Sequence, residues 1–296
     1  MTFDQILKSL KKKEFKPVYF LHGNESYFID TISDYIEENV LNESEKAFNF
    51  TVLYGKDTDH LTVVDCARRY PMMASHQVVI LKEAQGMKTL KELQTYIERP
   101  LESTILVICH KHKTFNVNTK FGQSLKKNAL VFQSKKLYDN QIPDWIGSYL
   151  KGKKLQIGPD GSALLAEYLG NDLSKIANEL NKLAINLAPG TLVSLQHIEE
   201  NIGISKDYNV FELQKALGLR DVVKSNRIVK YFTANPKVNP LPVLIGSLYN
   251  YFSKIYLLHF LKNKTDQELQ NALGLRSGFF LKEYKAAARV YSLKRT

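Results

Sequence analysis

The sequence predicts an α/β domain followed by an all-α region. In the first 136 residues, short apolar runs such as 78–81 and 104–108 alternate with segments whose apolar residues recur at helical spacing. Continuous apolar runs are typical of parallel strands covered on both faces, with helices as the crossovers between them. From residue 137 onward the helical spacing dominates. The chain has 296 residues, 44% of them hydrophobic, which is enough for two or three domains with sizeable cores.

The first region, residues 1–136, is expected to contain a mainly parallel sheet with helices on both faces. The expected strands are 18–21, 47–53, 78–81, 104–108 and 129–132. The expected helices are 1–13, 26–40, 61–70 and 85–98. Pro71 marks the end of the third helix because proline disfavours helical geometry in the residue before it. Pro100 ends the fourth in the same way.

The remainder divides into two helical regions, residues 137–203 and 204–296. The first is expected to hold helices at 142–150, 163–169, 172–185 and 194–201. The second is expected to hold helices at 210–217, 221–232, 243–262 and 278–291, with a proline-broken loop at 235–242. Aromatic and apolar residues lie around most of helix 243–262, more than one core-facing stripe requires. Both a central bundle helix and a subunit interface fit that pattern.

The sequence predicts the scaffold of a nucleotide-binding domain without the residues that bind phosphate and magnesium. Strand 18–21, Gly23 and the following helix stand where a phosphate-binding loop would lie. That loop needs a second glycine, a lysine and a serine or threonine, and the corresponding positions hold Phe28, Ile29 and Asp30. After the third strand, where an acidic pair would hold magnesium, the sequence has Lys82-Glu83. We therefore expect neither a nucleotide nor another cofactor at this degenerate site.

The segment from Tyr70 to Gln85 contains two consecutive methionines in a predicted turn. Pro71, Met72 and Met73 follow the third helix and precede the polar residues 75–77. Methionine adapts its shape readily, both as core filler and at binding surfaces. The residues alone leave two interpretations open: the pair fills space under the sheet, or it protrudes as an apolar plug.

The bulk composition indicates a cytoplasmic protein with an anionic partner. The net charge is +11, and lysines gather in small clusters at 11–13, 151–154 and 282–294, which permits but does not establish nucleic-acid binding. No apolar run approaches the length of a membrane span, and the N-terminus lacks a signal-peptide core. Two isolated cysteines favour a reducing compartment. The run 109–112, Cys-His-Lys-His, has no second Cys/His cluster, so a sheet-edge loop is expected there and not a metal site.

Taken in order, five segments resemble the delta-subunit family of the bacterial DNA polymerase III clamp loader. They are PVYFLHGNESYFID (17–30), PMMASHQVVILKEAQ (71–85), the helix around Trp145-Ile146, GNDLSKIANELNKL (170–183) and YNVFELQKALG (208–218). The resemblance spans nearly the whole chain. It implies an AAA+ domain with a degenerate nucleotide site at 1–136, a small helical lid domain at 137–203 and a helical collar domain at 204–296. Family members usually extend further at the C-terminus, so the end of the collar is expected to be either truncated or divergent.

The resemblance also implies a function. The delta subunit is a non-ATPase member that binds the ring-shaped sliding clamp and helps to open it for loading onto primed DNA, while the neighbouring motor subunits handle ATP. Its fellow subunits in the loader are tau/gamma and delta prime. In the family, a hydrophobic pair before the third strand inserts into the clamp. By position it falls on Met72 and Met73, beside Pro71, where the family often has leucine and phenylalanine. The implied partners are therefore the clamp, the other loader subunits through the collar, and primed DNA.

Two alternatives belong to other classes of protein. A divergent P-loop ATPase or nucleotide kinase would need phosphate chemistry from Phe28, Ile29 and Lys82, whose side chains do not provide it. A stand-alone basic DNA-binding protein would bind DNA tightly and with a steep salt dependence. The sequence shows neither a recognition helix nor an aromatic-basic ribbon in its support.

Overall fold

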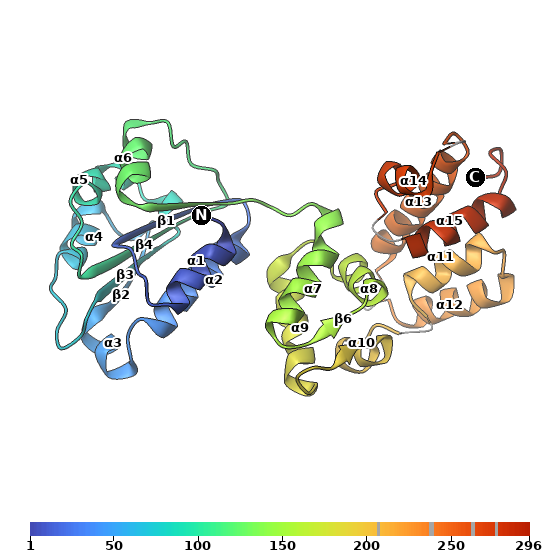
Figure 1. The fold of residues 1–296 in the computed structure, drawn as a ribbon, viewed down its shortest axis with the longest axis horizontal. Coiled ribbons are helices and arrows are strands. Elements are labelled where there is room, and N and C mark those ends of the chain that lie inside the picture. The colour runs from blue at the N-terminus through green and yellow to red at the C-terminus, as the bar shows by residue number, and fades with distance from the viewer. Residues whose placement is uncertain (206–207, 237–239, 262–263, 276–277) are drawn as a thin grey trace. The chain divides into compact units, whose positions relative to one another are not determined.

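A computed structural model describes residues 1–205, 208–236, 240–261, 264–275 and 278–296. The chain divides into two compact units, Met1–Lys136 and Leu137–Thr296 (Figure 1). Within the described ranges, no helix is both long and apolar enough to cross a membrane.

The first unit is built on a five-stranded sheet in which every pairing is parallel. The strands are β1 (Val18–Gly23), β2 (Phe50–Tyr54), β3 (Gln77–Lys82), β4 (Thr104–Lys111) and β5 (Leu130–Ser134). Their order is β2-β3-β4-β1-β5. The inner strands β1, β3 and β4 are buried over almost their whole length, which explains their unbroken apolar sequence. The predicted α/β class is confirmed.

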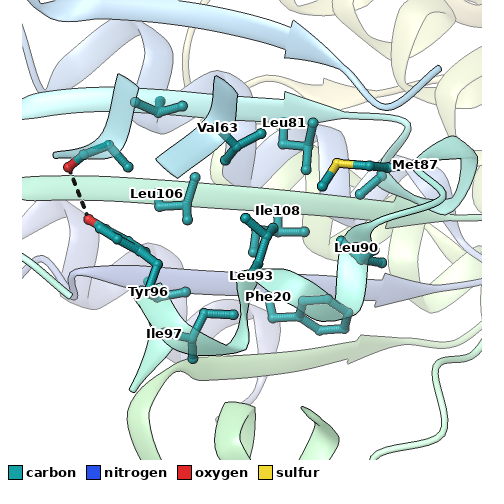
Figure 2. Packing of buried hydrophobic residues seen from close by; sticks show 14 of the residues in the cluster. Phe20, Val63, Leu81, Met87, Leu90, Leu93, Tyr96, Ile97, Leu106 and Ile108 are labelled. Atoms are coloured by element: carbon teal, nitrogen blue, oxygen red, sulfur yellow. Dashed lines mark hydrogen bonds between the residues drawn. The ribbon is translucent and has the colours of Figure 1, made fainter. Parts of the chain in front are cut away.

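Helices cover both faces of this sheet. They are α1 (Phe3–Lys11), α2 (Ser26–Asn39), α3 (Glu43–Asn49), α4 (His60–Ala67), α5 (Gln94–Ile97) and α6 (Lys120–Asn128), with 3₁₀ turns η1 (Ala84–Gly86) and η2 (Leu90–Leu93). On one face Ile6 of α1 and Ile29 of α2 pack against the strands. On the other, Val63 of α4 and Leu93 of η2 pack against strand residues such as Leu106 (Figure 2). Both faces of the sheet are therefore covered by helices, and the outer strands β2 and β5 are partly buried.

Three of the predicted elements in this unit are wrong in part. Residues 47–49 were expected in a strand but end α3, because Asn42 and Glu45 form a capping box that starts a helix. The helix expected at 85–98 is broken into η1, η2 and α5. The third helix ends at Ala67, three residues before Tyr70. The residue four positions after Ala67 is Pro71, which has no N–H to donate to the Ala67 carbonyl, and two side chains from other segments bond that carbonyl instead. Helix α6, begun by a Thr119 cap, was not predicted.

The second unit is almost entirely helical, as expected. Its first part holds η3 (Asp139–Gln141), α7 (Ile142–Gly152), α8 (Pro159–Leu169), α9 (Leu173–Asn186) and α10 (Leu195–Ile202), with a short parallel pair of strands, β6 (Gln156–Ile157) and β7 (Leu192–Val193). Its second part holds α11 (Val210–Gly218), α12 (Val222–Ala234), α13 (Leu241–Leu258), α14 (Asp266–Ala272) and α15 (Gly278–Val290). Helix α14 was not predicted. The middle of the loop expected at 235–242 and the helix end expected at Lys262 lie outside the described residues.

Candidate functional site

The carboxyl ends of the parallel strands bring the predicted degenerate-site residues to one edge of the sheet. Gly23 at the end of β1 pairs with Lys111 at the end of β4, and Lys82 ends β3. In open α/β sheets this edge is where ligands bind. The sequence placed Gly23, Phe28, Ile29, Asp30, Lys82 and Glu83 at this site, and the structure shows what each of them contacts.

The loop after β1 is closed onto β5. A Cβ atom at Gly23 would lie 1.9 Å from the carbonyl oxygen of Ser134, and Gly23 has φ +134°, so only glycine fits there. The Asn24 amide donates to that carbonyl at 3.2 Å, and the Glu25 amide donates to the Ser134 hydroxyl at 3.1 Å. The Tyr27 amide donates to the Glu25 carboxylate at 3.2 Å. Three amides of the kind that cradle phosphate in a working loop are thus bonded to the protein itself.

The next three positions of the motif also serve the fold. The Phe28 ring packs on that of Phe3, with centroids 4.7 Å apart. Ile29 is completely buried in the core beneath α2. Asp30 forms an ion pair with Lys111, in which the carboxylate oxygen lies 2.6 Å from Nζ. None of the three side chains offers a phosphate ligand.

Two lysines neutralise the acidic groups at this edge. Lys111 Nζ lies 3.6 Å from Glu83 as well as near Asp30, and Lys82 Nζ lies 3.3 Å from Glu37. Burial opposes the charge on Lys111, but the neighbouring carboxylates Asp30 and Glu83 outweigh it and raise the pKa of the ammonium. The same balance, with Glu37 as the main carboxylate, raises the pKa of Lys82. Both cations stay charged and already have anionic partners.

The segment Cys109 to His112 is not the sheet-edge loop that we expected, because β4 continues through Lys111. Cys109 packs on the face covered by α1 and α2, whereas the neighbouring His110 lies against Phe20 and Phe115 on the other face. Burial raises the pKa of the Cys109 thiol to about 12, so it stays protonated. Within the described ranges there is no group of three or more His, Cys, Asp or Glu side chains placed to hold a metal ion.

The methionine pair lies at the opposite, amino edge of the sheet. Residues 68–76, which we call the tip, connect the end of α4 to the start of β3. Met72 is 60% exposed and Met73 fully exposed, while Ala74 turns back to pack on the core. Pro71 is half-buried. The interpretation of the methionines as core filler is therefore wrong, and a protruding apolar pair remains.

Both ends of the tip are fixed to the sheet domain. The Ala67 carbonyl at the end of α4 accepts a hydrogen bond from the Tyr96 hydroxyl at 3.1 Å, drawn as the dashed line in Figure 2. It accepts a second hydrogen bond from the Thr104 hydroxyl at 2.8 Å. At the far end, the His76 ring packs edge-on against Phe15, with centroids 5.4 Å apart. The residues on both sides of the exposed methionines are thus held against the sheet domain.

One residue of this region was missed by sequence reasoning. Asn49, the last residue of α3, is completely buried and bonds to both backbone groups of Met72. An isolated asparagine between a helix and a strand carries no sequence pattern that points to such a role. Phe48 beside it is 70% exposed, which adds apolar surface at the amino edge.

Comparison with known proteins finds a described family that matches most of the sheet domain. Residues 19–135 match the family described as "DNA polymerase III, delta subunit". A Bacillus subtilis (strain 168) protein named DNA polymerase III subunit delta is 26% identical over 258 residues, covering 84% of this chain and 73% of that protein. This chain is related to the DNA polymerase III delta subunits. The resemblance recognised in the sequence is thereby confirmed.

A solved delta structure shares the fold of the chain. The Bacillus subtilis DNA clamp loader delta protein (YqeN) superposes with a TM-score of 0.63 at 23% identity, over 99% of this chain and 89% of that one. The predicted combination of an AAA+-like sheet domain with a helical C-terminal part is confirmed. The family match begins in β1 and ends just after β5, so it includes the degenerate site and the tip of this delta-related chain.

Proposed function

We propose that this chain acts as the delta subunit of a replicative clamp loader, gripping a sliding clamp through Met72 and Met73. The observation that carries the proposal is the full exposure of Met73 beside a largely exposed Met72, on a segment whose two ends are anchored. A soluble domain gains nothing in its own stability from exposing two adjacent long apolar side chains. Burying each in a partner's pocket yields about 1.5–3 kcal/mol, enough for a pair to dominate an interface.

Ring opening by this subunit requires no chemistry at the sheet domain. The tip needs only to bind the distorted clamp interface more tightly than the closed one, because the difference in affinity shifts the clamp toward the open form. Two methionines in place of leucine and phenylalanine keep the apolar volume but lose aromatic stacking. We therefore expect the affinity for the clamp to come from removing the two methionine side chains from water.

The subunit is proposed to neither bind nor hydrolyse ATP. The loop amides of Asn24 and Glu25 are bonded to Ser134, and Lys111 is paired with Asp30. A phosphate would have to displace these contacts and would then lie beside carboxylates. ATP chemistry in the proposed assembly belongs to neighbouring subunits.

The collar region supplies a surface for those neighbours. Helix α13 exposes a series of apolar side chains beyond those that pack within the bundle: Leu241, Val243, Ile245, Tyr249, Tyr256 and Leu257. Tyr251 and Ile255 of the same helix are buried in its core. We propose that residues 204–296 form a collar domain and 137–203 a lid domain, with the exposed α13 residues facing other loader subunits. The net charge of +11 favours contact with primed DNA inside the assembly.

The decisive experiment is a clamp-binding assay on wild type and on the double variant Met72→Ala, Met73→Ala. The purified sliding clamp encoded in the same genome is immobilised, and dissociation constants are measured by surface plasmon resonance. We expect at least about 100-fold weaker binding for the double variant, from about 3 kcal/mol or more of lost burial. Because both side chains are exposed, the melting temperature should not change. Equal affinity of the two proteins would refute the assignment.

A further inference from the structure

Asn49 makes a two-way contact with the backbone of a single tip residue. Its Nδ2 donates to the Met72 carbonyl at 2.9 Å, and the Met72 amide donates to its Oδ1 at 2.6 Å. Nδ2 also donates to the Glu45 carbonyl within α3, at 2.9 Å. The side chain therefore uses both of its N–H groups and one lone pair of its oxygen. Asn49 thus bonds both the amide and the carbonyl of Met72, as the backbone of a paired strand does.

The position of Asn49 explains how it reaches the tip. It ends α3 and directly precedes β2, while the tip directly precedes β3. Because β2 and β3 pair in parallel, with Phe50 opposite Val78, both segments leave the sheet at the same edge. A residue 23 positions earlier in the chain thus lies beside Met72.

The tip needs such a contact because its middle has no regular structure of its own. Met73 has φ +53°, a left-handed conformation that is unfavourable for side chains other than glycine, asparagine and aspartate. The end anchors at Ala67 and at Ala74–His76 do not hold Met72 itself. A loop free to move would lose conformational entropy on binding, which weakens affinity. The pair of hydrogen bonds from Asn49 removes that freedom before a partner arrives.

We propose that Asn49 is a positioning residue that holds Met72 and Met73 in the conformation that enters the sliding clamp. The inference rests on the proposed clamp-binding function and deepens it: Asn49 acts through the tip and touches no partner, since it is completely buried. Its amide fixes the Met72 backbone, and Met73 follows in the left-handed conformation that directs it outward.

The test uses Asn49→Ala with Asn39→Ala as a matched control. Asn39 at the end of α2 donates to the Tyr35 carbonyl at 2.9 Å, the same contact four residues back that Asn49 makes with Glu45. Asn39→Ala therefore tests the loss of that helical contact alone. For Asn49→Ala we expect about tenfold weaker clamp binding in the surface plasmon resonance assay, the equivalent of two modest hydrogen bonds. Asn39→Ala should bind as wild type does.

A double-mutant cycle separates positioning from general stability. Combined with Met73→Ala, the Asn49→Ala change should weaken binding by less than about threefold, because the side chain that it positions is gone. An undiminished tenfold loss in the Met73→Ala background would show that Asn49 supports the domain and does not position the pair, and would overturn the inference. Clamp binding by Asn49→Ala equal to wild type would also overturn it.

Hydrogen exchange supplies a readout that needs neither the clamp nor a folded variant. In the wild-type protein the Met72 amide should exchange at least about tenfold more slowly than that of exposed Met73 after correction for intrinsic rates. An unprotected Met72 amide would overturn the inference while leaving the proposed function standing. If instead the double methionine variant binds the clamp normally, the proposed function itself fails, and the two failures are thereby told apart.

Discussion

Lys111 and Asp30 form an ion pair of 2.6 Å at the carboxyl edge of the sheet, where a related nucleotide-binding domain would hold phosphate and magnesium. Lys111 is mostly buried and also faces Glu83. Its ammonium takes the place of an external cation: it links α2 to the end of β4 and neutralises the carboxylates that remain there. At this edge the mostly buried Lys111 is thus paired with two partly exposed carboxylates, Asp30 and Glu83.

Replacing Lys111 with methionine should therefore destabilise the sheet domain. The change keeps the apolar stem but removes the cation that pairs with Asp30 and Glu83, whose side chains are 41% and 39% exposed, so we expect a cost of about 1 kcal/mol. Urea denaturation followed by circular dichroism measures it. Lys113→Met, at an exposed position two residues later, is the control and should leave the midpoint unchanged. Equal midpoints for both variants would contradict a stabilising role for Lys111.

Gly23→Ala should impair folding of the first unit. A methyl group there meets the Ser134 carbonyl oxygen at 1.9 Å, and φ +134° is strained for any L side chain, so we expect a loss of at least about 3 kcal/mol. Gly147→Ala is the matched control, because this glycine lies inside α7 with open space where a Cβ would be. It should be neutral or stabilising by up to about 1 kcal/mol. Thermal melts of the two variants compare the effects directly.

Stability should fall on acidification below pH 6.5 because of a buried histidine. Burial is the main cause that lowers the pKa of His22 to about 4, with nearby His110 adding to it. The unfolded chain takes up a proton near pH 6.5, whereas the folded chain resists it until about pH 4. The contribution is thus fully present above pH 6.5 and is lost progressively between pH 6.5 and 4, up to about 3 kcal/mol.

Urea denaturation at pH 7 and pH 5 measures this effect. His22→Asn keeps an acceptor for the Phe115 amide, which donates to His22 Nδ1 at 3.1 Å, and should flatten the pH dependence. The control variant His112→Gln, at an exposed position, should keep the pH dependence of the wild type. A His22→Asn profile parallel to that of wild type would show that the pH dependence comes from other groups.

A negative charge on the exposed face of α13 should block assembly without unfolding the chain. Tyr249 is 72% exposed, so Tyr249→Asp should leave the melting temperature unchanged while weakening association with partner loader subunits about tenfold or more. Co-elution with those subunits in gel filtration measures it. Ile185→Asp, at an 82% exposed position on α9, serves as the control and should co-elute normally. Full assembly by the Tyr249 variant would place the subunit interface elsewhere.

Titration with a fluorescent ATP analogue should show no saturable, magnesium-dependent binding at micromolar concentration. The amides of Asn24 and Glu25 and the Lys111 ammonium are all occupied by protein groups. The same titration on a P-loop ATPase supplies the positive control. Tight binding here would revive the ATPase or kinase alternative and contradict the proposed role.

Much of the fold, and the side chains at the carboxyl edge of the sheet, could be predicted from sequence because both depend on short local patterns. Strands such as 104–108 are continuous apolar runs, and a run of that kind has few stable places other than the middle of a parallel sheet. The absence of phosphate chemistry at Phe28, Ile29 and Asp30 follows position by position from a motif. The error at 47–49 is a local signal that the strand pattern hid, the capping box of Asn42 and Glu45. At 85–98 the Gln85 and Thr89 side chains accept hydrogen bonds from the distant Lys111 and His60 amides, contacts that no local pattern indicates.

The sequence by itself determined that the chain has a parallel sheet domain and a helical remainder, and that the positions of a phosphate-binding motif after the first strand hold Phe28, Ile29 and Asp30. Only the tertiary structure decided whether Met72 and Met73 lie inside or outside, since two apolar residues in a turn favour burial by hydropathy alone. The segment that carries them bonds to Asn49, which the pairing of β2 with β3 brings to Met72, and it begins where the Tyr96 and Thr104 hydroxyls bond to the Ala67 carbonyl. Those contacts join residues 23 to 37 positions apart, and such distances are set by packing, which no local pattern encodes.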